Sequence, residues 1–225
     1  MMRKLLMIMV LCTAIGGMQA QNNNKELRDS LAVLNQLIGE NPRSTDYRLK
    51  KAAINIQLAQ WNYAIDEYNH VLSIQPENLA ALYYRAYALV NIREYGLAKA
   101  DYIRFLKLSP IHFEARLGLA VVNEKLGRWK NAMDDYNMLV EMFPDSAQAY
   151  AGRAAFERTQ KMYAPSLYDW DQAMRLDPLN ADYAASKADL QIFLNEKIAA
   201  RETLDAAVRR GIPHAALRKW YHKSK

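Results

Sequence analysis

The residue types best suited to catalysis or metal binding are sparse in this 225-residue sequence and do not gather in one motif. No His-Glu-x-x-His pair, Gly-x-Ser-x-Gly elbow or phosphate-cradling glycine loop is present. Metal ligands and nucleophile–base pairs need such fixed spacings because their side chains must converge on one point. The sequence therefore predicts no catalytic residue, no metal and no cofactor. The four histidines stand at unrelated spacings, at His70, His112, His214 and His222.

Three aspartates are the best remaining candidates for chemistry, because they recur at one constant interval. They are Asp101, Asp135 and Asp169. Catalytic groups must converge on a single substrate, and evenly spaced copies do not provide that. We therefore expect a structural role, such as hydrogen bonding between repeats, and a protein that is not an enzyme.

The same interval separates five prolines, which mark the ends of a repeating segment. Self-similarity at a fixed period of 20–50 residues is typical of arrays of small supersecondary units. The prolines are Pro42, Pro76, Pro110, Pro144 and Pro178, and the step from each to the next is constant.

Small and large side chains return at fixed distances before each proline. A small residue facing a large one lets two helices approach closely and interlock, so both positions are expected in the core. Twelve residues before the prolines stand Ser30, Ala64, Ala98, Ala132 and Ser166. Eight residues before them stand Leu34, Tyr68, Tyr102, Tyr136 and Trp170, and fifteen before them Trp61, Tyr95, Trp129 and Tyr163.

With these positions and a period of about 34 residues, the chain resembles the tetratricopeptide repeat (TPR) family of stacked helix–turn–helix units. The resemblance implies an all-α fold, a right-handed α-solenoid. We expect a linker and leading half-repeat helix over 21–42, and four full TPR units over 43–178. A degenerate fifth repeat over 179–212 and a basic capping helix over 213–225 complete the expected organisation.

Individual residues predict where the helices begin and where one turn lies. Asn78, Ser146 and Asn180 can accept hydrogen bonds from the free N–H groups at a helix start. Gly127 suits a tight turn between paired helices, because glycine adopts a positive φ at little cost.

Residues 1–20 predict a secretory signal peptide. Arg3 and Lys4 precede a short apolar run, and small and polar residues follow up to Ala20. Cleavage is expected between Ala20 and Gln21, which gives an exported protein, periplasmic or secreted. A lipid anchor on Cys12, as in bacterial lipoproteins, is the less favoured alternative.

Charge and cysteine content bound the possible partners. The formal net charge of the chain is +6, and it is +4 once Arg3 and Lys4 are removed with the signal peptide. Cys12 is removed as well, so the mature protein has no thiol for a disulfide or a zinc site. From Asn195 onward, eight Lys and Arg face three Asp and Glu, a net charge of +5. No interleaved aromatic platform accompanies these charges, so nucleic acid is not expected. A solvated cap is favoured, with contact to an anionic surface as the alternative.

In TPR proteins the first helices line a concave side that binds extended peptides or partner helices. Family members that clamp a terminal carboxylate place Lys and Asn there. This sequence has mostly apolar and tyrosine residues instead, so a carboxylate clamp is not expected. The candidate groove residues are Leu49, Ala53, Tyr83, Tyr84, Tyr87, Asn91, Leu117, Val121, Glu124 and Arg158.

Together these features predict an exported, non-enzymatic adaptor that holds a protein or peptide partner in an apolar, tyrosine-rich groove. Tyr83 and Tyr87 are expected to contribute to binding with little effect on folding, and to form adjacent rows with Leu117 and Val121. The alternative is a small accessory subunit of a cell-envelope or secretion complex, which it would contact through its convex or basic C-terminal surface. An enzyme is the least favoured reading.

Overall fold

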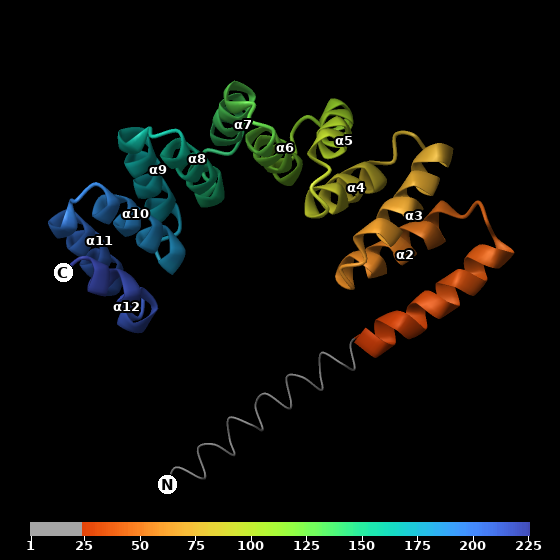
Figure 1. Cartoon of the computed structure of the whole chain (residues 1–225), viewed down its shortest axis with the longest axis horizontal. Coiled ribbons are helices and arrows are strands. Elements are labelled where there is room, and N and C mark those ends of the chain that lie inside the picture. Colours follow the sequence, from red (N-terminus) through yellow and green to blue (C-terminus); the bar gives the residue numbers. More distant parts are fainter. Residues whose placement is uncertain (1–23) are drawn as a thin grey trace, which may run out of the picture. The chain divides into compact units, whose positions relative to one another are not determined.

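The computed structural model describes residues 24–225, and over that range the chain is built from helices joined by short turns (Figure 1). A leading helix covers residues 24–40. The predicted cleavage site at Ala20 and Gln21, and the alternative anchor at Cys12, lie outside the described residues. After the leading helix come α2 (Thr45–Gln57), α3 (Trp61–Ile74), α4 (Leu79–Asn91), α5 (Tyr95–Leu108), α6 (Phe113–Lys125), α7 (Trp129–Met142), α8 (Ala147–Thr159), α9 (Tyr163–Leu176), α10 (Ala181–Phe193), α11 (Lys197–Arg209) and α12 (His214–Lys223).

The helices come in pairs that repeat at the sequence period. The first helices of the pairs are α2, α4, α6, α8 and α10, and their starting residues are separated by the same constant step as the prolines. No strand occurs among residues 24–225. The predicted fold class, an all-α solenoid of stacked helix–turn–helix repeats, is confirmed.

Each of these first helices begins at a side chain that caps it. The carboxamide oxygen of Asn78 accepts a hydrogen bond from the backbone N–H of Ala81 at 2.9 Å. Ser146 and Asn180 do the same for α8 and α10, so the three predicted caps are confirmed. The sequence reading missed Ser44 and His112, whose Oγ and Nδ1 atoms accept from the helices that follow. Capping of this kind stabilises a helix by about 1 kcal/mol.

The turn inside each helix pair contains one residue with a positive φ. Gly127 has φ 67°, as predicted. The equivalent position in the other pairs holds a residue with a side chain, where this conformation costs about 1 kcal/mol or more. These residues are Ala59, Arg93, Lys161 and Asn195, with φ between 54° and 65°.

The chain divides into two compact units, the first ending at Leu108 and the second beginning at Ser109. In the first, α3 packs against both α2 and α4, and α4 packs against α5. In the second, successive helices from α6 to α11 pack in the same way, and α12 lies against α10 and α11. None of the helices within residues 24–225 is both long and apolar enough to cross a bilayer.

Most of the small and large positions form the interior of the helix pairs, as predicted, but the prediction is wrong for Ser30, which is exposed on the leading helix. Ala64, Ala98 and Ala132 are fully buried. The large residues eight before each proline are at most 8% exposed: Leu34, Tyr68, Tyr102, Tyr136 and Trp170. The prediction fails for Trp129, which is 50% exposed although its ring lies 6.5 Å from that of Phe156 of the following first helix. The equivalent residues Trp61, Tyr95 and Tyr163 are half-buried.

The C-terminal helices replace part of this apolar pattern with polar contacts. Gln191 is buried in α10 and accepts a hydrogen bond from the hydroxyl of Thr203 in α11 at 2.8 Å. Lys187 donates to Asp171 of α9 at 2.5 Å. The two polar residues thus keep hydrogen-bonding partners where a helix pair would ordinarily bury apolar side chains.

Candidate functional site

Three tyrosines of α4 form the centre of an aromatic surface in the first unit. We call Tyr83, Tyr84 and Tyr87 the α4 tyrosine cluster. The rings of Tyr83 and Tyr84 meet edge to face at 5.0 Å between centroids. Tyr84 stacks on Tyr68 of α3 at 6.4 Å, and Tyr87 meets the edge of Trp61 of α3 at 6.0 Å. These contacts restrict the rotation of the three large side chains.

The members of the cluster differ in how much of each ring reaches solvent. Tyr84 is 47% exposed and Tyr87 41%. Tyr83 is only partly exposed, because its ring contacts Tyr102 and Phe105 of α5 at 6.1 and 5.8 Å. The expectation that Tyr83 lies off the packed core is therefore wrong. Tyr84 and Tyr87 are the solvent-exposed members of the cluster.

Three further predicted residues belong to the same unit. Leu49 of α2 is half-buried and Ala53 is exposed one turn later. Asn91, at the end of α4, is exposed and donates its side-chain amide to the carbonyl of Tyr87 at 2.9 Å. Its amide is therefore partly engaged in ending the helix.

The predicted residues of the second unit have contacts of their own. Leu117 packs against the cluster that contains Tyr136 and Phe156, and Val121 is half-buried. Glu124 accepts a 3.4 Å hydrogen bond from the hydroxyl of Tyr136. The alignment of Leu117 and Val121 with the tyrosines joins residues of both units, and it stays a prediction.

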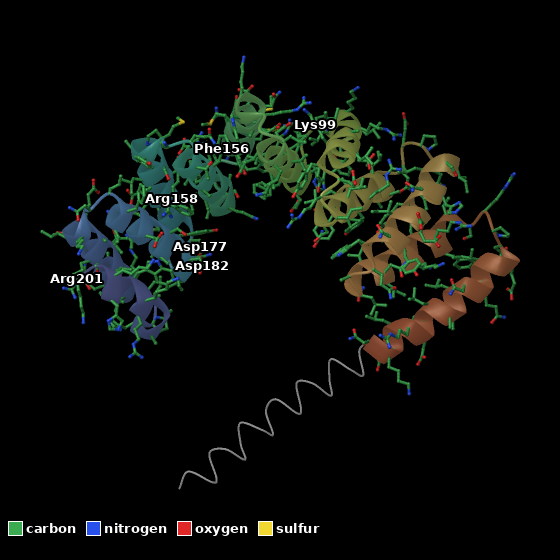
Figure 2. All side chains as sticks on the ribbon, viewed as in Figure 1. Lys99, Phe156, Arg158, Asp177, Asp182 and Arg201 are labelled. Atoms are coloured by element: carbon green, nitrogen blue, oxygen red, sulfur yellow. The ribbon has the colours of Figure 1, made fainter. Side chains whose placement is uncertain are left out.

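Arg158 is held by an ion pair. It extends from α8 (Figure 2) and its guanidinium lies 2.8 Å from Asp189 of α10. The same carboxylate accepts from Lys223 of α12 at 3.0 Å. The two cations lower the pKa of Asp189 against the opposing effect of burial. Arg158 thus links α8 to the C-terminal helices.

The recurring aspartates are structural, as predicted, but their hydrogen bonds run inside each repeat. Arg85 of α4 grips Asp101 of α5 with two bonds of 2.6 and 2.7 Å. Arg153 of α8 grips Asp169 of α9 in the same way, at 2.6 and 2.9 Å. Asp135 instead accepts from Asn123 at 2.8 Å and from an arginine of its own repeat. Bidentate pairs of this kind are the stronger class of hydrogen bond.

The arginines, not the aspartates, carry the bond to the preceding repeat. The third guanidinium nitrogen of Arg85 donates a hydrogen bond to the side-chain oxygen of Asn69 of α3 at 2.7 Å. Arg153 donates to Asn137 of α7 at 3.0 Å. The sequence reading did not single out these arginines, although each stands at the same distance before its aspartate. That shared spacing was the available signal.

Glu157 is the most perturbed acid of this network. It is 5% exposed, its Oε1 lies 4.0 Å from Arg153, and its Oε2 has no hydrogen-bond partner among the described residues. Burial, reinforced by the negative charge of Asp169, raises the pKa of Glu157 to about 7. Glu157 and Asp169 thus share the guanidinium of Arg153 inside one repeat. Across residues 24–225, His, Cys, Asp and Glu do not gather in a group that could hold a metal.

The geometry defines the class of protein first: over residues 24–225 it is an all-α protein of stacked helix pairs. The tetratricopeptide repeat family matches residues 83–147. A TPR protein from Parabacteroides merdae shares 20% identity at a TM-score of 0.65, over 91% of this chain and 80% of its own. No curated protein matches the sequence.

Two other solved structures have a similar fold. A MamA fragment from Desulfovibrio magneticus RS-1 shares 18% identity at a TM-score of 0.66, over 79% of this chain and 96% of its own. YrrB, a TPR protein with an unusual peptide-binding site, shares 19% identity at 0.61, over 83% of this chain and 96% of its own. At these identities the similarity shows that the fold is that of TPR proteins.

Proposed function

We propose that the protein is a non-enzymatic adaptor that binds a protein or peptide partner on the face formed by its first helices. The observation that carries the proposal is the exposure of Tyr84 and Tyr87 beside rings that hold them in place. Tyrosine offers a large apolar face and a polar tip with few rotatable bonds, so it loses little entropy on binding. The peptide-binding description of the similarly folded YrrB is consistent with this role.

The partner is an extended peptide or a helix that lays apolar side chains between these two rings. Tyr84 and Tyr87 are three residues apart, so they share one side of α4. Leu49 and Ala53 on α2 offer the apolar continuation of that face in the first unit. Within the second unit, the proposed partner-binding residues are Leu117, Val121, Glu124 and Arg158.

The test compares matched tyrosine variants. Tyr84→Ala and Tyr87→Ala each remove an exposed ring, and Tyr168→Ala removes a ring that is 61% exposed on α9, a second helix of its pair. Each variant is used to capture proteins from the envelope fraction of the source cell, followed by mass spectrometry and titration of the captured partner. Loss of either cluster ring is expected to weaken binding by about 2 kcal/mol, or roughly thirtyfold.

The thermal melts of these variants separate binding from folding. Tyr84→Ala and Tyr87→Ala are expected to melt near the wild-type temperature, because much of each ring is already in water. Unchanged affinity in both variants, with normal melts, would place the partner elsewhere. Tyr83→Ala is unsuitable as a probe because its packed ring makes folding and binding losses inseparable.

We also propose that the protein is exported by its N-terminal signal and acts in the periplasm or outside the cell. Its basic start and short apolar run support this. N-terminal mass spectrometry of the native protein is expected to find a chain beginning at Gln21. A chain that keeps Met1, or one lipidated at Cys12, would contradict it.

The excess of positive charge beyond Asn195 favours one alternative, an accessory subunit of an envelope or secretion complex held by its C-terminal surface. Reversing the charge of Arg209 and Lys219 distinguishes the two roles. Loss of partner capture in that variant, with capture intact in Tyr84→Ala, would favour the accessory subunit. The opposite result supports the adaptor.

A further inference from the structure

A second candidate site lies at the C-terminal end of the protein, where α12 packs against α11. A cavity of about 540 Å³ opens there, which we call the C-terminal cavity. Arg201 of α11, labelled in Figure 2, lines it from one side. From α12 and the residues after it come His214, Arg218, Tyr221, His222 and Lys225. None of these lining side chains is acidic.

The walls of the C-terminal cavity are held in place by packing and by one hydrogen bond. Leu217 of α12 is fully buried in the C-terminal core cluster and anchors that helix. The rings of His214 and Tyr221 stack at 4.4 Å with 20° between their planes. The hydroxyl of Tyr221 donates to Asp205 of α11 at 2.7 Å, so this neighbouring carboxylate is already engaged.

The positive charges of the cavity are not neutralised by other residues in the described part of the chain. Arg201, Arg218 and Lys225 have no carboxylate within 4 Å among residues 24–225. Lys223 differs, because it pairs with Asp189 at 3.0 Å. Arg201, Arg218 and Lys225 therefore line one cavity without an ion-pair partner among the described residues, while the neighbouring carboxylate of Asp205 is hydrogen-bonded to Tyr221.

This arrangement suits a compact, multiply charged oxyanion. Two guanidinium groups can each donate a pair of parallel hydrogen bonds to phosphate oxygens, and a lysine adds a point charge. The stacked rings of His214 and Tyr221, together with Ala215, add apolar surface beside these cations. The volume falls within the range of small-molecule sites. We infer that the C-terminal cavity binds a phosphate-type oxyanion, independently of the α4 tyrosine cluster.

The test removes two cavity charges and compares a variant with the same loss of charge elsewhere. Arg201→Gln with Arg218→Gln neutralises the cavity. Arg210→Gln with Lys219→Gln removes two charges from the same basic region without touching its lining. The purified full chain and both double variants are titrated with pyrophosphate by isothermal calorimetry at low salt. Saturable one-to-one binding is expected, weakened at least tenfold by the cavity variant and less than twofold by the control.

A second arm identifies the source of the oxyanion. Vesicles of phosphatidylglycerol and of phosphatidylcholine are sedimented with each protein. Sedimentation with phosphatidylglycerol alone, lost only in the cavity variant, assigns a lipid headgroup; pyrophosphate binding without sedimentation assigns a soluble phosphorylated ligand. Absence of pyrophosphate binding, or an equal loss in both double variants, would overturn the inference, because the second result shows only diffuse charge attraction. Thermal melts of the double variants are expected to match the wild type, since Arg201 and Arg218 are exposed.

Discussion

Replacement of Arg153 by alanine tests how much the buried acid–base network contributes to stability. In the folded protein Asp169 is 1% exposed and accepts two hydrogen bonds from Arg153, at 2.6 and 2.9 Å. Glu157, also buried, has the same guanidinium as its nearest cation, at 4.0 Å. Arg153→Ala therefore leaves two carboxyl groups in the interior without a positive charge.

The expected loss of folding free energy is set by whichever costs less, leaving a carboxylate buried and unpaired or protonating it. Leaving one carboxylate buried and unpaired costs about 3–5 kcal/mol. Taking up a proton at pH 7 costs about 4 kcal/mol for a carboxyl group that ordinarily titrates near pH 4, since each pH unit is worth about 1.4 kcal/mol. The loss of stability is therefore about 4 kcal/mol at pH 7, and about 1.5 kcal/mol at pH 5, where protonation is cheaper.

The assay is urea unfolding followed by circular dichroism at both pH values. Arg175→Ala is the matched control, because that arginine is exposed on α9 and bonds only to the side chain of Gln172. It is expected to change stability by less than about 0.5 kcal/mol. Arg153→Lys keeps the charge but loses the paired hydrogen bonds, so an intermediate loss is expected.

Two outcomes would refute this reasoning. One is a loss in Arg153→Ala that equals the loss in Arg175→Ala at pH 7. The other is a loss in Arg153→Ala that does not shrink from pH 7 to pH 5, which would show that lost packing rather than unpaired charge is responsible. Arg153→Lys tests the same network if Arg153→Ala does not fold.

Three further predictions concern stability, each followed by the same urea assay. The folded state raises the pKa of Glu157 from 4.5 to about 7, so its proton stabilises the fold below pH 4.5 and this contribution is lost as pH rises through 7. Glu157→Gln is therefore expected to gain stability relative to wild type from pH 5 to pH 8. Parallel plots of unfolding free energy against pH for the two proteins would contradict this. Ala98→Leu and Ala132→Leu are each expected to cost about 1–3 kcal/mol by overpacking, and an unchanged midpoint for both would refute their placement between helices. Ala59→Gly is expected to stabilise by about 0.5 kcal/mol and Gly127→Ala to destabilise by about 1 kcal/mol, because both positions have a positive φ; equal effects of the same sign would contradict this.

The sequence by itself determined the class of fold and many of its boundaries. The repeat period needs only regular spacing to be seen, and Ala98 opposite Tyr102 follows from helical geometry within one segment. The cap at Asn78 and the turn at Gly127 are also local, because a short side chain bonds its own backbone and a glycine relieves its own steric clash. Such local features can be predicted without knowing which distant residues are in contact.

The tertiary structure alone decided which side chains on one helix reach solvent. Tyr83 and Tyr84 are neighbours in sequence, yet Tyr83 packs against α5 while Tyr84 stays exposed. The pairing of Arg85 with Asp101 likewise depends on two helices lying side by side. The burial of a side chain and the charges near it depend on several segments of the chain. No local sequence pattern therefore reveals that the pKa of Glu157 is raised. The unpaired cations of the C-terminal cavity became visible for the same reason, once α11 and α12 brought them together and left them without an acid.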